Sequence, residues 1–186
     1  VAAIDDISGT LYATDTRREV MFLDETPAGK SWRMTGLNNV TQLRASGGQL
    51  YAILADGRLI VADRDGKNSR QLFPRTLKPG SSIEVSQGVL YVINEGSVFR
   101  YRNKKWDAKL QPIAFSIQKL VVRGETWYGL DAAGRVFSSA SQSYIDRDGN
   151  IIGLWGLGPN LLVLTRDHNR FFHDPKENTW GAWARW

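Results

Sequence analysis

One short stretch, Gly48 to Val61, carries the pattern that most constrains this chain. It reads GQLYAILADGRLIV, two runs of strand-forming residues separated by Asp56-Gly57. An Asp-Gly pair between two apolar runs predicts a β-hairpin. We take Leu50 as the anchor of this hairpin. The equivalent residues of the five repeats are Leu11, Leu50, Leu90, Trp127 and Leu161, which are spaced 39, 40, 37 and 34 residues apart. A period of this length with strand-like content predicts a repeat architecture.

Each repeat has room for four strands. An apolar segment expected to form the innermost strand precedes each hairpin: 2–7, 40–43, 83–85, 117–122 and 151–157. A run containing an aromatic residue follows and suits an outermost strand: 32–34, 71–73, 106–110, 144–145 and 180–183. Four-stranded units of this size are typical of β-propeller blades. The sequence therefore predicts an all-β fold, a five-bladed β-propeller of four-stranded antiparallel blades.

The blades are expected at approximately 1–36, 37–76, 77–112, 113–147 and 148–186, in a single domain excised from a longer protein. Each blade then lies within one stretch of chain, so closure of a ring rests on packing of the first blade against the fifth. An arc belonging to a propeller of six to eight blades is the alternative. The segment 75–82 (RTLKPGSS) looks like an insertion before the third hairpin and contains a Pro-Gly turn.

Composition narrows the function classes. The 186 residues contain no cysteine, which excludes disulfides, thiolate metal ligands and thiol nucleophiles. A cysteine-free chain fits a cytosolic or a bacterial secreted protein, and the compartment stays unknown. No apolar run reaches the length of about 18 residues that a membrane-spanning helix needs. The net charge of +5 favours an acidic partner. Nucleic acid is not favoured, because no aromatic platform alternates with Lys and Arg.

The segment from Trp32 to Val61 also resembles a repeat of a known family. It contains a Trp, then TGLNNVTQL, GGQLYAI and DGRL, and in this order it is similar to a tectonin-type β-propeller repeat. Looser matches lie around Trp106, Trp127 and Trp180. Tectonin-like and tachylectin-like propellers are often carbohydrate-binding, and related repeats serve as interaction modules. The resemblance implies a binding role, although no polar ligand residue recurs in every repeat as a multivalent lectin would need.

The sequence gives little support for a catalytic site or a metal site. The two histidines, His168 and His173, are five residues apart and point to opposite faces of a strand. Two D-R-D-G segments, 63–66 and 146–149, invite comparison with a calcium loop. The second matches the start of such a loop but has Leu157 in place of the distal glutamate, and hairpin turns explain both segments. We therefore predict no catalytic residue, no metal site and no cofactor. A propeller hydrolase, which needs two acids facing one pocket, is the weakest of the three functional hypotheses.

Basic residues give the candidate binding site. An arginine lies in or just after the turn between the second and third strands of several repeats, and turns of this kind gather on one face of a propeller. Trp155 lies on an innermost strand, where it either packs or lines a ligand cleft. The candidate partner-binding residues are Arg17, Arg58, Arg135, Trp155, His168 and Arg170.

The sequence thus predicts a non-enzymatic recognition module. The first hypothesis is a protein–protein interaction through the turn-rich face of the propeller, with a partner that is acidic in charge. The alternative is a lectin that holds carbohydrate between blades.

Overall fold

A computed structural model describes residues 3–7, 10–27, 29–107, 117–123, 126–146, 149–157, 160–174, 177 and 179–182. The chain divides into two compact units, Val1–Leu90 and Tyr91–Trp186, and each is described by itself. The boundary between them falls inside the strand β10.

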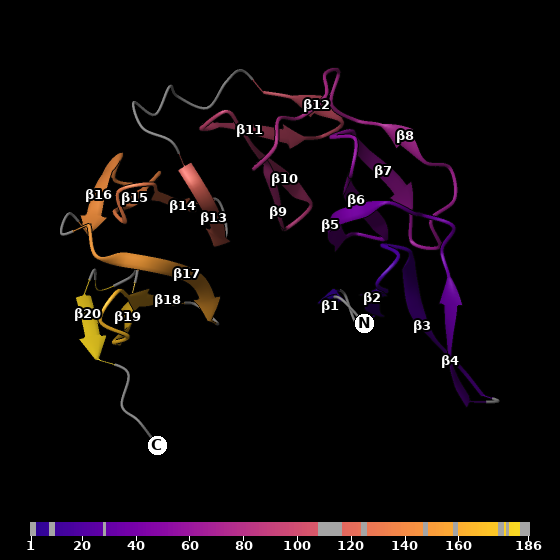
Figure 1. Cartoon of the computed structure of the whole chain (residues 1–186), viewed down its shortest axis with the longest axis horizontal. Helices are drawn as coiled ribbons and strands as arrows, with labels where there is room; N and C mark the ends of the chain where they lie inside the picture. Colours follow the sequence, from indigo (N-terminus) through magenta and orange to yellow (C-terminus); the bar gives the residue numbers. More distant parts are fainter. Residues whose placement is uncertain are drawn as a thin grey trace. The chain divides into compact units, whose positions relative to one another are not determined.

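The described strands form five four-stranded sheets, each built from four strands that are consecutive in the chain (Figure 1). The first sheet contains β1 (Ala3–Ile7), β2 (Thr10–Thr14), β3 (Val20–Thr26) and β4 (Gly29–Met34), and the second β5 (Val40–Ser46), β6 (Gln49–Leu54), β7 (Leu59–Asp63) and β8 (Arg70–Gln71). The third contains β9 (Ser82–Ser86), β10 (Val89–Asn94), β11 (Ser97–Arg102) and β12 (Lys105–Trp106). The fourth contains β13 (Ile117–Arg123), β14 (Thr126–Asp131), β15 (Val136–Ser138) and β16 (Ser143–Asp146), and the fifth β17 (Ile151–Leu157), β18 (Asn160–Thr165), β19 (Arg170–Asp174) and β20 (Thr179–Ala182). The predicted all-β class and the five antiparallel four-stranded sheets are confirmed.

Two turn types recur among the connections between strands. Tight two-residue turns have positive φ at both positions, which matches the twist of the paired strands. They are Gly47-Gly48, Gln87-Gly88, Glu95-Gly96 and Asn103-Lys104.

A wider five-residue turn recurs with one hydrogen-bond pattern. The first residue donates its N–H to the fifth carbonyl, and the fourth residue donates its N–H to the first carbonyl. The fourth residue has positive φ, as expected for a type I turn that ends in a bulge. These turns are 15–19, 54–58, 63–67, 131–135 and 165–169, with Arg18, Gly57, Gly66, Gly134 and His168 at the fourth position. Asp56-Gly57 is therefore the centre of a wide turn rather than a two-residue loop.

Three of the wide turns, 15–19, 54–58 and 131–135, also hold the segment that follows their sheet. The carbonyl of the fourth turn residue accepts an N–H from the first residue of the next sheet in two of them: Val40 donates to Arg18 at 3.0 Å, and Ile151 donates to Gly134 at 3.0 Å. In the second sheet, Leu77 donates to Gly57 at 2.8 Å. A residue with positive φ is thus needed at a point where two repeats touch.

Apolar side chains fill the space between neighbouring sheets within each unit. In the first unit, Tyr12 and Val20 of the first sheet share a buried cluster with Leu43, Leu50 and Ile60 of the second. In the second unit, the equivalent cluster joins the fourth and fifth sheets and contains Tyr128, Leu130, Val136, Leu154 and Leu161.

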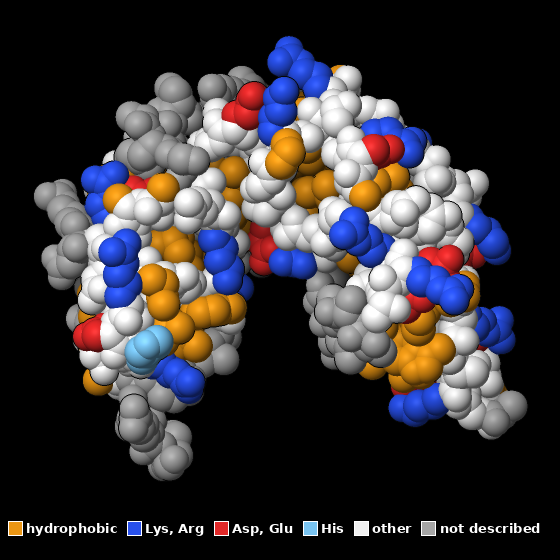
Figure 2. Space-filling model, viewed as in Figure 1, with side chains coloured by type: hydrophobic (Ala, Val, Ile, Leu, Met, Phe, Trp, Pro, Cys, Tyr) orange, Lys and Arg blue, Asp and Glu red, His pale blue; other side chains and the backbone are white. Residues whose placement is uncertain are grey.

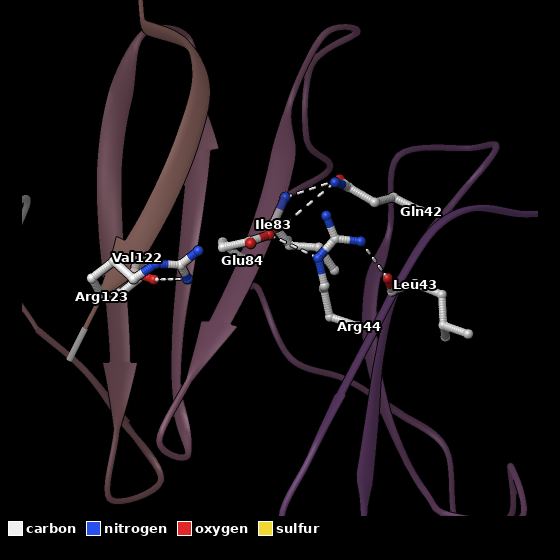
Figure 3. Close-up of polar contacts among 7 residues, drawn as sticks. All are labelled: Gln42, Leu43, Arg44, Ile83, Glu84, Val122 and Arg123. Carbon is white, nitrogen blue, oxygen red and sulfur yellow. Dashed lines mark hydrogen bonds and ion pairs between the residues drawn. The ribbon is translucent and has the colours of Figure 1, made fainter. Parts of the chain in front are cut away.

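Polar side chains join the innermost strands β5 and β9 (Figure 3). The Gln42 amide accepts from the Ile83 N–H at 2.9 Å and donates to the Ile83 carbonyl at 3.3 Å. Two residues on, the Arg44 Nε lies 2.7 Å from the Glu84 carboxylate. Glu84, an acid that the sequence places on an innermost strand, is therefore half of an ion pair between two sheets.

The outermost strand of the second sheet is shorter than its apolar run. The sequence places a strand at 71–73, but β8 ends at Gln71, and Leu72 and Phe73 are buried beyond it. Leu72 still donates its N–H to the Leu59 carbonyl at 2.8 Å. The chain then reaches Pro74, which cannot donate to a sheet. Parts of two other predicted outermost strands, 108–110 and Trp183, lie outside the described residues. No helix in the described part of the chain is long and apolar enough to cross a membrane.

Candidate functional site

The two candidate arginines of the first unit, Arg17 and Arg58, lie in wide turns. Arg17 is exposed, and its backbone N–H donates to the Asp15 carboxylate at 2.9 Å. Arg58 forms an ion pair with Asp56 at 2.7 Å, with both side chains about half exposed. The pKa of Asp56 is below its ordinary value because its carboxylate accepts hydrogen bonds from Arg58. The bond from the Arg58 backbone N–H has the larger effect, and the bond from the guanidinium adds to it. The charge of Arg58 is thus offset within its own turn.

Arg135 belongs to a tighter cluster in the second unit. Its guanidinium lies 2.8 Å from Asp131, whose side chain is only 1% exposed, and it stacks 4.5 Å from the centre of the Tyr144 ring. The Asp131 carboxylate also accepts the N–H groups of Ala133 and Arg135 and, at 3.1 Å, the Tyr144 hydroxyl. Arg135 is therefore held as a structural cation, with 34% of its side chain exposed.

The same cluster changes the titration of Tyr144. Burial and the hydrogen bond to Asp131 raise the pKa of Tyr144 to about 12, because the neutral phenol is the form that donates to the carboxylate. A raised pKa of this kind contributes stability below pH 10 that is lost as the pH rises from about 10 to 12. We expect Asp131→Asn to return the Tyr144 pKa toward 10. Ultraviolet titration of tyrosinate, taken as the difference from Tyr144→Phe, measures it, and an unchanged pKa in Asp131→Asn would contradict the assignment.

The register of the fifth sheet separates Arg170 from the turn arginines. Arg58 and Arg135 are the fifth residues of their wide turns, but the fifth residue of the turn 165–169 is Asn169. Arg170 comes one residue later, inside β19, where it pairs with Leu164. His168 is exposed and takes the fourth position, with φ 64°. Arg58, Arg135 and Arg170 are thus not three copies of one structural position.

Within the first unit, backbone hydrogen bonds bring three segments to one edge. The turn 15–19 meets the start of β5 through the Val40–Arg18 bond, and Ala55 of the turn 54–58 donates to the Asn39 carbonyl at 2.7 Å. The segment 76–82 joins the same turn through the Leu77–Gly57 bond. Turns and connecting segments of the first two sheets therefore form one continuous edge.

An open cleft of about 800 Å³ lies at this edge. Its walls come from three segments: the start of β5, the end of β6 with its turn, and the connecting segment that holds the Pro-Gly turn. The lining residues are Thr41, Gln42, 53–57 and 76–82. The sequence marks 75–82 as insertion-like, but it gives no signal that these residues close a cleft with a hairpin more than twenty positions earlier.

The cleft offers mixed chemistry. The hydroxyl groups of Thr76 and Ser82 line it together with the apolar side chains of Leu54, Ala55 and Pro79. Among the described lining residues, Asp56 is the one acid and Lys78 the one base, and none is aromatic or a histidine. This surface suits a ligand that carries both apolar groups and many hydrogen-bonding groups.

Trp155, the remaining predicted site residue, is 42% exposed on β17. It lines a separate pocket of about 310 Å³ on the fifth sheet, together with Leu162, Val163, Leu164 and Arg170. Trp155 and Arg170 are thus brought together, although the sequence gives no reason to pair them. This pocket lies in the second unit, whereas the cleft lies in the first.

The described residues contain no cluster of three or more His, Asp or Glu side chains that could hold a metal ion. In the first D-R-D-G segment, Asp63 accepts the Gly66 N–H at 2.8 Å on its carbonyl, and its carboxylate accepts from Asn68 at 2.6 Å. Asp63 therefore serves a wide turn. The second segment, 146–149, lies partly outside the described residues.

Comparison with known proteins identifies the fold. No family model matches the chain, and a search of curated proteins finds no match. Among solved structures, a chain in the crystal structure of a nidogen/laminin complex superposes with a TM-score of 0.64 at 15% identity, covering 92% of this chain and 73% of that one. The WD40 β-propeller domain of Doa1 superposes with a TM-score of 0.65 at 9% identity, covering 95% of this chain and 65% of that one. The chain has a β-propeller fold.

The propeller fold accounts for the sheet order and the repeated turns. Each sheet is a blade whose first strand is innermost. The wide turns between second and third strands, 15–19, 54–58 and 131–135, lie at the same end of a blade as the segments that lead to the next blade. At these identities the likeness concerns the fold alone. The resemblance to tectonin-type repeats stays a prediction, because no family model supports it.

Proposed function

We propose that this propeller is a non-enzymatic recognition module that binds a segment of a partner protein in the cleft of its first unit. The observation that carries the proposal is the cleft itself, about 800 Å³ and lined by Thr41, Gln42, 53–57 and 76–82. Binding sites for small ligands and short peptide segments are concave and combine apolar walls with a few polar groups. The cleft has this composition.

The lining favours polypeptide over carbohydrate. Sugars commonly present an apolar face that packs on an aromatic ring, and the described residues place no aromatic side chain in this cleft. A peptide needs apolar contact for its side chains and hydrogen-bonding groups for its backbone. Leu54, Ala55 and Pro79 supply the first, and the hydroxyl groups of Thr76 and Ser82 supply the second.

The same lining argues against hydrolysis. A glycosidase needs two carboxyl groups that face one site. Asp56 is the one acid that the described residues bring to the cleft, and its carboxylate is already paired with Arg58. None of the described lining residues is a histidine that could act as a general base.

The fold and the charge of the chain support a protein partner. One solved structure with this fold is a complex of nidogen with laminin, two proteins. The net charge of +5 and the exposed Arg17 beside the start of β5 favour a partner segment with acidic residues. Charge of this kind acts on the rate of encounter more than on the final affinity.

The test uses a displayed library of random peptides in parallel with a glycan array. Ala55 is exposed and lines the cleft, so Ala55→Trp is expected to fill it and lower the affinity of selected peptides at least tenfold. Ala132 occupies the equivalent exposed position of the turn 131–135 in the second unit, so Ala132→Trp is the matched control. We expect that control to bind as the wild type does.

Two outcomes would overturn the proposal. The first is a set of selected peptides whose affinity is the same for Ala55→Trp and Ala132→Trp, because the cleft would then not be their site. The second is specific, competable glycan binding that Ala55→Trp abolishes, which would establish the lectin alternative.

A further inference from the structure

The pocket on the fifth sheet combines an exposed indole with apolar walls. Trp155 pairs with Leu162 across β17 and β18, and Leu164 pairs with Arg170 across β18 and β19. Directly paired residues lie on one face of a sheet, as do residues two apart on a strand. These four side chains therefore share one face, and together they line the cavity of about 310 Å³.

The opposite face of the same sheet is filled. Leu154, Leu161 and Val163 are 0–1% exposed and belong to the cluster between the fourth and fifth sheets. Trp155, by contrast, is 42% exposed and Arg170 is exposed. The pocket is therefore on the face of the fifth sheet that does not pack into the core of the second unit.

Two cationic side chains lie at the pocket, Lys119 and Arg170. The Lys119 Nζ lies 4.3 Å from the centre of a Trp155 ring. The Arg123 guanidinium lies on the opposite face of the sheet, because it occupies the place of a Cβ on Gly156, which pairs with the buried Leu161. Arg170 lines the pocket, and no described side chain forms an ion pair with it.

This arrangement favours a ligand that carries both an apolar group and a carboxylate. An apolar or aromatic side chain is stabilised against Trp155, Leu162 and Leu164, and a neighbouring carboxylate is stabilised by Arg170, whose planar guanidinium matches carboxylate geometry. Figure 2 shows hydrophobic side chains gathered on this part of the second unit between Lys and Arg side chains.

We propose that the pocket formed by Trp155, Leu162, Leu164 and Arg170 is a second binding site, which takes an acidic peptide segment that carries a bulky apolar residue. Charge complementarity is the reason for choosing this occupant: the apolar surface lies beside Lys119 and Arg170, which attract a carboxylate and repel a basic segment. The site goes beyond the proposed function, because it lies in the other unit and shares no residue with the cleft.

The experiment compares three defined peptides on the whole chain. They are acetyl-Gly-Glu-Phe-Glu-Gly-amide, its neutral counterpart with Gln in place of Glu, and acetyl-Gly-Glu-Gly-Glu-Gly-amide without the aromatic residue. Binding is followed by the nuclear magnetic resonance shift of the Trp155 indole N–H, assigned with Trp155→Phe. We expect the Glu-Phe-Glu peptide to bind about tenfold tighter than either of the others, since charged hydrogen bonds and apolar burial each contribute at this scale.

Two arginine variants test whether the pocket itself causes the preference for the acidic peptide. Arg170→Gln is expected to remove that preference, and Arg166→Gln, which changes a neighbouring arginine that does not line the pocket, is expected to keep it. Ala55→Trp, which blocks the cleft, is expected to leave this binding unchanged, so failure here and failure of the cleft proposal are distinguishable.

Three results would overturn the proposal. They are equal affinities for the acidic and neutral peptides, no effect of Arg170→Gln, and a concentration-dependent dimer in which the Trp155 indole is already protected. The last result would mean that a second copy of the chain occupies the pocket.

Discussion

Replacing Gly66 with alanine is expected to lower the free energy of unfolding by about 3 kcal/mol, from left-handed strain and overpacking together. Gly66 has φ +80°, and a Cβ there would lie 2.2 Å from the Thr35 carbonyl oxygen and 2.6 Å from the Thr35 Cβ. Thr35 is itself buried and bound to the Val20 carbonyl through both its N–H and its hydroxyl. The backbone therefore cannot move away cheaply. Urea unfolding of the purified chain measures the change.

Gly48 gives the matched control for this prediction. It has a similar φ of +76°, but a Cβ there would meet nothing within 4 Å. Gly48→Ala therefore carries only the cost of the left-handed conformation, about 1–2 kcal/mol. If the two variants lost the same stability, the close approach of Thr35 to Gly66 would not be what excludes a side chain at position 66.

Replacing Asp131 with alanine is expected to cost about 2–3 kcal/mol, because it leaves a half-buried cation and several donors without an acceptor. The carboxylate accepts the backbone N–H groups of Ala133 and Arg135, the Arg135 guanidinium and the Tyr144 hydroxyl. The figure is set below that of a fully buried ion pair because Arg135 is 34% exposed. Thermal and urea unfolding measure it.

Asp56→Ala is the control, since Asp56 also binds the backbone N–H and the guanidinium of the fifth turn residue, Arg58, but with about half of both side chains exposed. We expect it to change stability far less than Asp131→Ala. Equal losses would show that the turn pattern matters and burial does not.

The Asp131 cluster also predicts the sign of a pH effect. Burial by itself raises the pKa of Asp131, but the hydrogen bonds from Arg135 and Tyr144 outweigh it, and the pKa lies below its ordinary value of 3.8. A lowered pKa contributes stability above pH 3.8 that is lost as the pH falls through the folded-state value. The stability difference between the wild type and Asp131→Asn should therefore shrink in acid below about pH 4.

The sheets could be predicted because each local signal agreed with the repeat. In the stretch Gly48 to Val61, the apolar runs became β6 and β7, and the equivalent runs became the same strands of the other sheets. The period of 34 to 40 residues then left room for two more strands in each unit. Strand boundaries were harder, because β8 ends where Pro74 and local burial intervene rather than where the apolar run ends.

The candidate sites were less predictable, because they depend on register and on contacts between distant segments. Arg58 and Arg170 look equivalent by sequence, but the five-residue turns place Asn169 and not Arg170 at the position of Arg58. Arg135 looks like a free surface cation, and only its contact with Asp131 reveals a structural role. The segment 76–82 closes a cleft through the Leu77–Gly57 hydrogen bond. No local sequence pattern predicts this contact between distant segments.

The central claim is that the cleft of the first unit recognises a peptide segment, and a map of backbone amide shifts tests it most directly. A peptide selected against the whole chain is titrated into isotope-labelled protein. We expect the largest shifts at cleft residues such as Thr41, Thr76 and Gly80, and their loss in Ala55→Trp. Shifts confined to residues outside the cleft, unchanged in Ala55→Trp, would contradict the claim.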